Sequence, residues 1–320
     1  MDAPANRAKA SPPAVPPDRY LSPGARYHED ITSGDDISTG HLPSARQAQA
    51  AVDEAYRRYR SETSGLASQV YPALGRMPGH LFGICVAGID GGMYRAGDSG
   101  HEFTIMSVAK PLVFALVCDV LGAERVRHEL GVNATGLAFD SLASIERSAD
   151  GRSNPMVNAG AIAATSLAPG ESGEEKCRIY WDPAGTVDLY TRQSCLLTSA
   201  EDLAVMTATL ADGGVNPVTG VQVVTPDACQ HALAVMATAG MCETSGDWLF
   251  DVGVPGKSGI GGGIIAVSPG RGGLGAFSPL LDPAGNSVRG QLAARHLSRT
   301  LGLSLFASKA RRLSLPRVLP

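Results

Sequence analysis

The sequence predicts an α/β protein of the α+β type, in which one antiparallel sheet, flanked by helices, is built from both ends of the chain and carries an inserted helical subdomain. Strand patterns occur at residues 81–96 and return at 264–267, whereas residues 125–239 between them have a mostly helical pattern. The 320 residues are 44% hydrophobic and 18% charged, which is enough for one large domain with a substantial apolar core.

The composition divides the chain into three parts. Residues 1–45 are rich in Pro, Ala, Ser and Asp without periodicity, so we expect a disordered or loosely docked N-terminal arm. Residues 46–308 predict a single domain, and residues 309–320 a C-terminal tail. Within the domain, we expect segments 46–120 and 240–308 to form an α/β subdomain and segment 121–239 to form the helical subdomain.

The N-terminal half of the sheet is predicted from a hairpin signal. Residues 47–60 have the spacing of an amphipathic helix, and residues 81–89 form an apolar run typical of a buried strand. The sequence Asp90-Gly91-Gly92 indicates a turn before a second short strand at 93–96. We therefore expect one helix followed by a β-hairpin.

The next segment, residues 107–121, is apolar on nearly all sides, as in a helix buried inside a domain. Pro111 is tolerated only in the first turn of a helix, so the helix is expected to begin close to Ser107. Ser107 would then lie at a helix N-terminus.

The second half of the chain returns from helix to strand. Thr198 and Glu201 have capping-box spacing and predict a helix over 201–210 that ends at Gly213-Gly214. A glycine-dense segment around Lys257 precedes the expected strand 264–267, and residues 270–275 indicate another turn. Residues 287–301 predict a closing amphipathic helix.

Charge and cysteine content exclude several classes of protein. The net charge of −4 and the pI near 6.0 give no basic surface for nucleic acid. The first twenty residues lack the apolar core of a signal peptide and no apolar run reaches membrane-spanning length, so we expect a cytoplasmic protein without a membrane partner. The six cysteines form no CxxC pair, so no metal site and no cofactor are expected, and most thiols should be free.

Ser107 and Lys110 are the first candidate catalytic pair. The chain has only five lysines, and Lys110 follows Ser107 at the i+3 spacing that places both on one helix face. Serine needs a base to become a nucleophile, and a lysine among apolar residues loses its charge more easily. An isolated SxxK match is weak evidence, because a surface lysine one turn after a serine is common.

A second motif strengthens the first. Lys257-Ser258-Gly259 matches the K-[ST]-G triad of the serine β-lactamase and penicillin-binding-protein class, in which it follows SxxK and lies on a strand beside the site. In that class the lysine and the hydroxyl orient an anionic substrate group. The segment 153–158 is the candidate third element, and its alternative interpretation is a plain Asn-Pro turn.

Five motifs together resemble the serine-dependent glutaminase family. They occur in the family's order, and the resemblance as a whole spans residues 38–306. The motifs are NPMVNAGAI, TVDLYTRQSC, LADGGVNP, GKSGIGGGI and GNSVRGQ. The resemblance implies a β-lactamase-like fold, hydrolysis of L-glutamine to L-glutamate and ammonia without a cofactor, and a homo-oligomer, often a tetramer.

The resemblance also implies residue roles. Ser107 matches the nucleophile and Lys110 its base partner, so the implied intermediate is a glutamyl ester on Ser107. Asn158 matches the asparagine that holds the amino-acid end of the substrate, and Tyr190 matches a tyrosine of the site. Ile260 matches the residue whose backbone N–H forms an oxyanion hole with that of Ser107.

Two departures from the family pattern predict reduced activity. Only 31 residues separate Asn158 from Tyr190, whereas the family has a longer helical segment there with two further substrate contacts. Cys242 in GMCETSG stands where the family has a substrate-site tyrosine, and Tyr71 is the displaced counterpart of an N-terminal one. The alternatives are an impaired or inactive paralogue kept for oligomerisation or ligand binding, and a β-lactamase-like or esterase hydrolase that uses Ser107.

Overall fold

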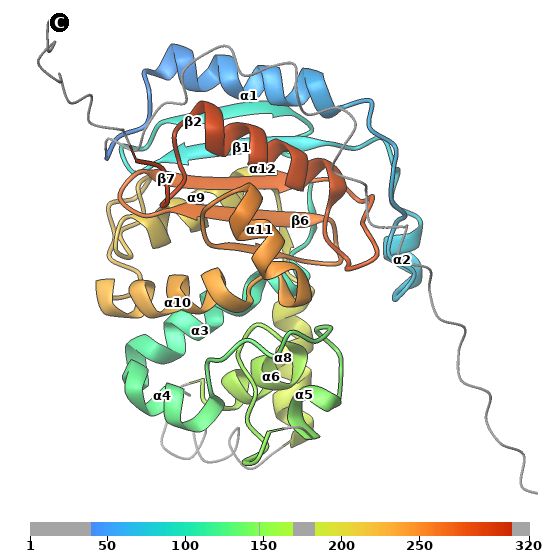
Figure 1. Ribbon diagram of the computed structural model, residues 1–320, viewed down its shortest axis with the longest axis vertical. Coiled ribbons are helices and arrows are strands. Elements are labelled where there is room, and N and C mark those ends of the chain that lie inside the picture. Colours follow the sequence, from blue (N-terminus) through green and yellow to red (C-terminus); the bar gives the residue numbers. More distant parts are fainter. Residues whose placement is uncertain (1–39, 147, 169–182, 309–320) are drawn as a thin grey trace, which may run out of the picture. The chain divides into compact units, whose positions relative to one another are not determined.

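The sheet of the protein is antiparallel and joins the two ends of the folded chain, as the sequence predicts. In the computed structural model, which describes residues 40–308 apart from 147 and 169–182, five strands lie in the order β2-β1-β7-β6-β5 (Figure 1). Each adjacent pair is antiparallel. The strands are β1 (Gly83–Gly88), β2 (Met93–Gly97), β5 (Gly256–Ser258), β6 (Gly263–Ser268) and β7 (Gly272–Phe277), while β3 (Phe103–Thr104) pairs separately with β4 (Leu197–Thr198).

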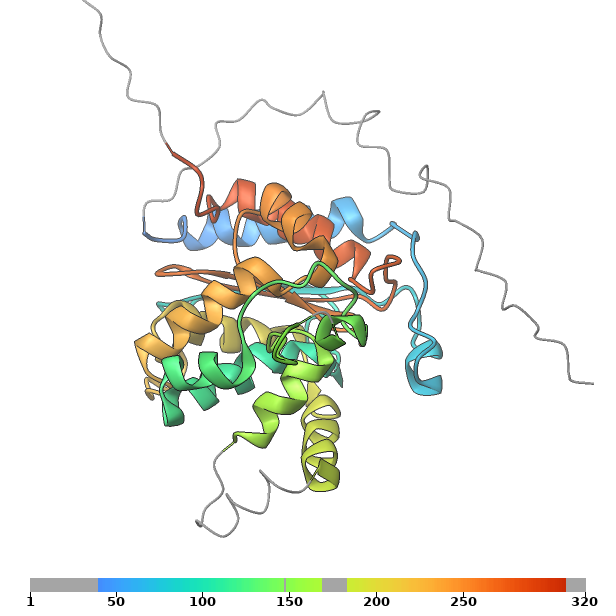
Figure 2. The same cartoon turned by 60° about the horizontal axis from the view of Figure 1, so that its bottom comes forward.

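Helices cover both faces of this sheet. In Figures 1 and 2, α1 and α12 lie over one face, whereas α9, α10 and α3 lie on the other side. Their bounds are α1 (Ala45–Tyr59), α3 (Ala109–Leu121), α9 (Ala200–Ala211), α10 (Pro226–Ala239) and α12 (Val288–Thr300). Further from the sheet lie α4 (Ala123–Leu130), α5 (Ala143–Glu146), α6 (Asn158–Ser166) and α8 (Pro183–Ser194); the remaining helices are α2 (Pro72–Gly75), α11 (Ser245–Asp251) and the 3₁₀ turns η2 (Met106–Val108) and η3 (Cys242–Thr244).

The strands bury both faces, so the core has two sides. Ile84 and Val86 of β1 pack in a cluster with α1 and α12, whereas Cys85 and Ala87 contact α9. This follows from the period of two along a strand, which sends alternate side chains to opposite faces. The hairpin of β1 and β2, predicted from the apolar run 81–89 and the turn at 90–92, is confirmed. The division of the domain into two subdomains stays a prediction, and the expected arm and tail lie almost wholly outside the described residues.

The central strand β7 corrects one expectation. We expected residues 270–275 to form a turn, but only residues 270 and 271 do so, with φ of Gly270 at 74°, and residues 272–277 form a fully buried strand. A Cβ at Gly273 would lie 2.0 Å from the Thr207 side chain, and one at Gly275 would lie 2.3 Å from the Ala200 carbonyl oxygen. The glycines of β7 therefore allow α9 to approach the sheet closely. In the sequence, the same glycines resemble a turn, which is why the strand was not predicted.

Two helix starts also differ from the prediction. The α-helix expected at Ser107 begins at Ala109, because residues 106–108 form the 3₁₀ turn η2 instead. The capping box expected at Thr198 lies one residue later, where Ser199 accepts from the Asp202 backbone and the Asp202 side chain bonds back. Thr198 is instead paired in β4, so its backbone is used by a strand.

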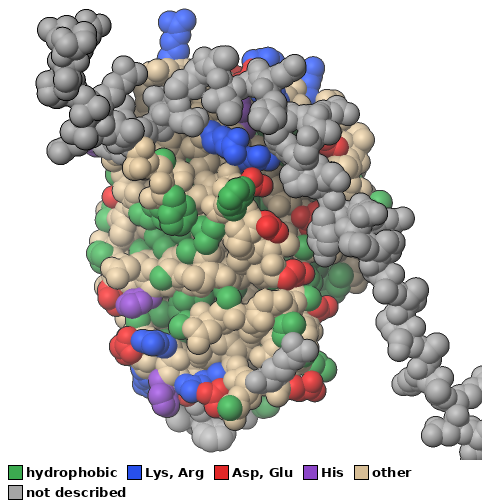
Figure 3. All heavy atoms as spheres, viewed as in Figure 1, with side chains coloured by type: hydrophobic (Ala, Val, Ile, Leu, Met, Phe, Trp, Pro, Cys, Tyr) green, Lys and Arg blue, Asp and Glu red, His purple; other side chains and the backbone are tan. Residues whose placement is uncertain are grey.

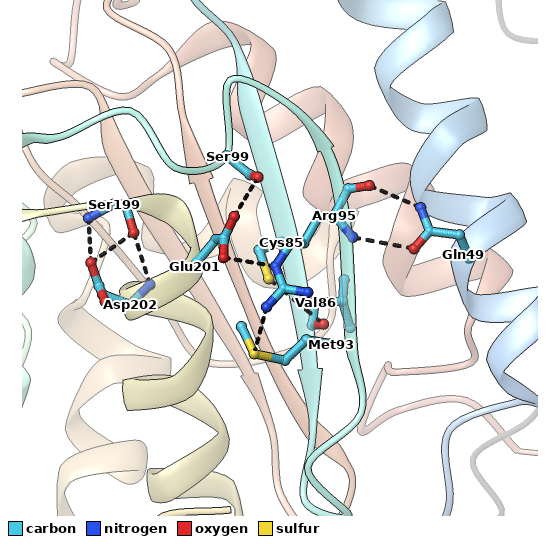
Figure 4. A network of polar contacts seen from close by, with 9 residues as sticks. All are labelled: Gln49, Cys85, Val86, Met93, Arg95, Ser99, Ser199, Glu201 and Asp202. Atoms are coloured by element: carbon cyan, nitrogen blue, oxygen red, sulfur yellow. Dashed lines mark hydrogen bonds and ion pairs between the residues drawn. The ribbon is translucent and has the colours of Figure 1, made fainter. Parts of the chain in front are cut away.

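A network of hydrogen bonds connects the edge strand β2 to helices α9 and α1 (Figure 4). Arg95 donates to Glu201 of α9 at 2.7 Å, and Glu201 also accepts from Ser99 at 2.8 Å. The Gln49 amide of α1 bonds both the N–H and the carbonyl of Arg95. Gln49 thus satisfies backbone groups that an edge strand would otherwise leave open.

Surface features of the described part are ordinary for a globular domain. Acidic and basic side chains both occur on the face drawn in Figure 3, and hydrophobic atoms emerge at several separate places. In the described part of the chain, none of the helices has the length and apolar character needed to cross a membrane.

Candidate active site

Ser107 lies on a strained turn at the entrance to α3. The residue before it, Met106, is buried and has φ at 49°, in the left-handed region that non-glycine residues rarely adopt. Such strain persists only where the surroundings impose it, and it is frequent at catalytic nucleophiles. The side chain of Ser107 is only partly buried and lines a pocket.

Lys110, one turn after Ser107, is 4% exposed. Its Nζ donates to Asn158 Oδ1 at 2.7 Å and to the Met156 carbonyl at 3.3 Å. Burial and, to a smaller extent, the positive charge of Lys257 lower the pKa of Lys110 to about 7, against a smaller opposing effect of Cys242. Lys110 is therefore able to exchange a proton near neutral pH.

Asn158 and Tyr190 meet beside Lys110. Tyr190 of α8 donates to Asn158 Oδ1 at 3.2 Å, so this oxygen accepts from both Tyr190 and Lys110. The Asn158 amide nitrogen remains as the donor that faces a ligand. Burial raises the pKa of Tyr190 to about 12, with a contribution from the nearby Tyr71, so the phenol stays protonated and acts as a hydrogen-bond donor.

Asn154, from the same sequence motif, has a structural role. It is 1% exposed, and its side chain donates to the Asn133 carbonyl and accepts from the Met156 backbone. These are the contacts of an Asn-Pro turn, so the alternative interpretation applies to Asn154. Of this segment, the Asn158 side chain and the Met156 carbonyl contact Lys110.

The K-S-G segment lies directly against Ser107. Lys257 and Ser258 belong to the short edge strand β5, and both are buried. A Cβ at Gly259 would be 3.2 Å from the Ser107 backbone nitrogen, so the close contact requires glycine. Burial lowers the pKa of Lys257 as well, with Cys242 and Glu243 acting in the opposite direction.

Ser107 and the K-S-G segment line one small pocket of about 280 Å³, whereas Lys110, Asn158 and Tyr190 are not among its lining residues. Its lining residues are Ser107, Phe139, Met241, Cys242, Lys257, Ser258, Ile260, Ala284, Gly285 and Asn286. A larger hollow of about 970 Å³ lies beside α4 and the segment that leads to Ser153. Of the candidate residues only Ser153 lines it, and neither Ser107 nor the K-S-G segment does, so we place the chemistry in the smaller pocket.

Two backbone N–H groups face this region without an internal partner. Within the described residues, no hydrogen bond uses the backbone N–H of Ser107 or that of Ile260. Paired N–H donors of this kind are the usual means of stabilising an oxyanion. In the same part of the chain, no group of three His, Cys, Asp or Glu side chains could hold a metal ion.

Cys242 has an unusual backbone. It begins the turn η3 with φ at 53°, and its side chain is partly exposed to the pocket. The thiol is free, like those of Cys85, Cys118, Cys195 and Cys229. Cys85, Cys118 and Cys229 are buried, and burial raises their pKa values to about 11 or 12.

Three residues of the site were not predicted. Asn286 is 2% exposed and lines the pocket, Thr244 bonds to it, and the Phe139 carbonyl accepts from the Asn158 backbone at 2.9 Å. Asn286 belongs to the quoted motif GNSVRGQ, which was the only sequence signal for it. Thr244 belongs to the quoted segment GMCETSG, whereas Phe139 lies in a segment without a recognisable pattern.

Comparison with known proteins identifies relatives over most of the chain. A sequence model of the family described as Glutaminase matches residues 65–182 and 175–306. Glutaminase 2 from Yersinia pestis is 52% identical over 326 residues, which covers 88% of this chain and 96% of the relative. A glutaminase from Mycobacterium ulcerans is 38% identical over 301 residues, covering 81% of this chain and 94% of its own.

Solved structures agree with the fold. A probable glutaminase, ybaS, superimposes with a TM-score of 0.79 at 36% identity, covering 83% of this chain and 100% of its own. A probable glutaminase from Bacillus subtilis gives a TM-score of 0.70 at 29% identity, with 82% and 97% coverage. The fold is therefore the β-lactamase-like one, as predicted.

The alignments also support a shortened segment. The alignment with the Yersinia relative is longer than the share of this chain that it uses, so roughly forty positions of the relative have no counterpart here. The two stretches that match the family overlap at residues 175–182, between α6 and α8. This agrees with the short spacing from Asn158 to Tyr190; residues 169–182 themselves lie outside the described residues.

Proposed function

The chain belongs to the glutaminase family, and on this premise we propose that it hydrolyses L-glutamine to L-glutamate and ammonia through an ester on Ser107. One observation carries the proposal. Ser107 lies on a strained turn beside the buried Lys110, whose pKa of about 7 suits proton transfer, and Lys257 and Ser258 line the pocket that Ser107 faces.

In the proposed first step, neutral Lys110 takes the proton of Ser107 as its oxygen attacks the substrate carboxamide carbon. The backbone N–H groups of Ser107 and Ile260 stabilise the oxyanion. Lys110 then returns the proton to the amide nitrogen, the C–N bond breaks and ammonia leaves. Water hydrolyses the glutamyl ester by the same route.

The substrate's amino-acid end is assigned to Asn158 and Tyr190. The Asn158 amide nitrogen is available as a donor, whereas the single hydroxyl hydrogen of Tyr190 goes to Asn158 Oδ1 and holds the Asn158 amide in this orientation. No metal or cofactor enters this mechanism. Assembly into a homotetramer and a cytoplasmic location remain predictions.

Purified protein should release ammonia and glutamate in equal amounts from L-glutamine, and this assay tests the proposal. The Ser107→Ala protein is the control. Equal background from both proteins would contradict the proposed activity and favour a catalytically silent family member. Hydrolysis of a chromogenic cephalosporin instead of glutamine would indicate a β-lactamase-like enzyme.

The rate of this reaction should fall below neutral pH. Lys110 must be uncharged to accept the Ser107 proton, so kcat/KM should rise with pH and level off above about 7, the pKa of Lys110. Below that value the rate should drop about tenfold per pH unit. A profile of kcat/KM against pH measures this rising part, the acidic limb of the profile.

The Lys257→Met variant tests the cause of this limb. The Lys257 charge lowers the pKa of Lys110, so its removal should move the limb to higher pH, whatever happens to the maximal rate. An unmoved limb would show that another group, not Lys110, titrates.

Cys242→Tyr is expected to raise activity. The family has a tyrosine at this position, and a thiol is too short to place a proton donor as deep in the pocket. Since proton-transfer groups contribute about 10²- to 10⁴-fold, an increase in kcat of at least about tenfold is expected. Cys195→Tyr, at an exposed cysteine outside the pocket, is the matched control. No change, or a decrease, would show that the thiol does not limit the rate.

A further inference from the structure

Behind the pocket, three side chains form a continuous line of hydrogen bonds. Thr244 donates to the Met241 carbonyl at 2.9 Å, the Asn286 amide nitrogen donates to Thr244 at 3.1 Å, and Ser258 donates to Asn286 Oδ1. Asn286 is 2% exposed and Ser258 is 7% exposed. The line therefore connects the K-S-G strand to the turn that carries Cys242 through buried groups.

The direction of each bond follows from the number of hydrogens. A threonine hydroxyl has one, and the Thr244 hydrogen is used by Met241, so Thr244 can only accept from Asn286. The Asn286 amide must then direct its NH₂ group to Thr244 and its oxygen to Ser258. Consequently the single hydroxyl hydrogen of Ser258 is used by Asn286.

The backbone around Asn286 keeps its side chain in this orientation. The Asn286 N–H donates to Asp282 Oδ1 at 2.9 Å, and the Asp282 N–H donates to the Asn286 carbonyl at 2.9 Å. Asp282 is itself held by Gln291 at 2.9 Å. A rotated Asn286 would leave buried donors and acceptors unpaired, which is costly.

The Ser258 oxygen therefore presents only lone pairs to the pocket. A carboxylate has no hydrogen to offer, so the expectation that Ser258 orients an anionic substrate group is not supported by this geometry. Glutamine does carry N–H donors, on its carboxamide and its ammonium. Ser258 and Ser107 line the same pocket, and a Cβ built on the neighbouring Gly259 would lie 3.2 Å from the Ser107 backbone nitrogen, so Ser258 lies close to the proposed nucleophile.

We propose that Ser258 accepts a hydrogen bond from the carboxamide N–H of the substrate, and that Asn286 and Thr244 are positioning residues that hold Ser258 as an acceptor. This rests on the proposed function. Ser258 gives up no proton; it orients the nitrogen, which takes its proton from Lys110 before the C–N bond breaks.

Comparing an amide with an ester tests this assignment, because the leaving oxygen of an ester carries no N–H. Ser258→Ala should lower kcat/KM for L-glutamine about tenfold, the effect of one hydrogen bond. For the γ-methyl ester of L-glutamate, kcat/KM of Ser258→Ala should stay within about twofold of the unsubstituted protein, because this substrate offers Ser258 no leaving-group N–H. Thr244→Val should also lower the ratio of kcat/KM for L-glutamine to kcat/KM for the ester. Thr244→Ser, which keeps the hydroxyl, should retain the ratio of the unsubstituted protein.

Thr238→Val, at a threonine that bonds only within its own helix α10, is the matched control. Thermal melting of each variant shows that it is folded. The Asn286→Leu variant removes the middle group of the line of hydrogen bonds. If this variant fails to fold, Thr244→Val and Thr244→Ser still test the positioning role. An equal loss for amide and ester in Ser258→Ala would overturn the assignment.

A binding measurement removes the dependence on turnover. In a Ser107→Ala background, calorimetry should show tighter binding of L-glutamine than of the ester, and Ser258→Ala should abolish this preference. Binding of both ligands without a preference would overturn the assignment alone. Failure to bind either ligand, together with failure of the unsubstituted protein to release ammonia, would overturn the proposed function as well.

Discussion

Ser107→Ala is expected to lower glutamine hydrolysis by about 10⁴- to 10⁶-fold, the range for loss of a serine nucleophile. Without the hydroxyl, no ester with the substrate can form, while the backbone N–H groups and Lys110 remain. Ammonia release measures the loss. Hydroxylamine should divert the ester of the unsubstituted protein to a γ-glutamyl hydroxamate, and this product should be absent from Ser107→Ala.

The stability of the variant should be unchanged, because the described contacts give the Ser107 side chain no hydrogen bond. Ser166→Ala is a suitable control, since the Ser166 hydroxyl bonds only the Ala163 carbonyl within α6, at 2.7 Å. Full activity in Ser107→Ala would contradict the proposed nucleophile. A comparable loss in Ser166→Ala would instead point to a general effect on the helical region.

Arg289→Met is expected to lower the free energy of unfolding by at least about 3 kcal/mol. Arg289 is 2% exposed, and its guanidinium donates to the carbonyls of Glu62, Gly79, His80 and Leu81 at 2.6 to 3.2 Å. It also lies over the Phe82 ring. Methionine keeps the apolar stem of the side chain but leaves four partly buried acceptors without their donor.

Denaturant unfolding measures this effect. Arg299→Met, at an exposed arginine of the same helix α12, should change the free energy of unfolding by less than about 0.5 kcal/mol. Arg289→Lys should remain destabilised, because one ammonium cannot match four carbonyls in a fixed planar arrangement. A stability equal to the unsubstituted protein in Arg289→Met would show that Arg289 does not hold segment 62–82 to α12.

Local sequence patterns correctly predicted those helices and strands whose conformation does not depend on contacts with distant segments. The apolar run 81–89 and the turn signal at 90–92 predicted β1 and β2, and the amphipathic spacing in 287–301 predicted α12, whose N-cap in the structure is Ser287. In contrast, the glycines of 272–275 resemble a turn. Their strand conformation depends on α9, which packs against β7 and requires residues without side chains.

The site shows the same division. SxxK and K-S-G predicted the positions of Ser107, Lys110 and Lys257, because each motif needs particular residue types at fixed spacing. No spacing could show that Thr244 and Asn286, 42 residues apart, share a hydrogen bond. Nor could it show which way the Ser258 hydroxyl points, since this depends on a line of donors and acceptors from three segments.

By itself, the sequence determined the fold class and the family, and it predicted the nucleophile with its lysine, because local periodicity and short motifs carry that information. Only the tertiary structure decided the strained backbone at Met106, the pKa of Lys110 and the orientation of Ser258. The physical reason is that burial, like charges and hydrogen-bond direction arise between residues distant in sequence. A sequence motif identifies the residues of a site, whereas the fold determines their protonation state and whether they donate or accept hydrogen bonds.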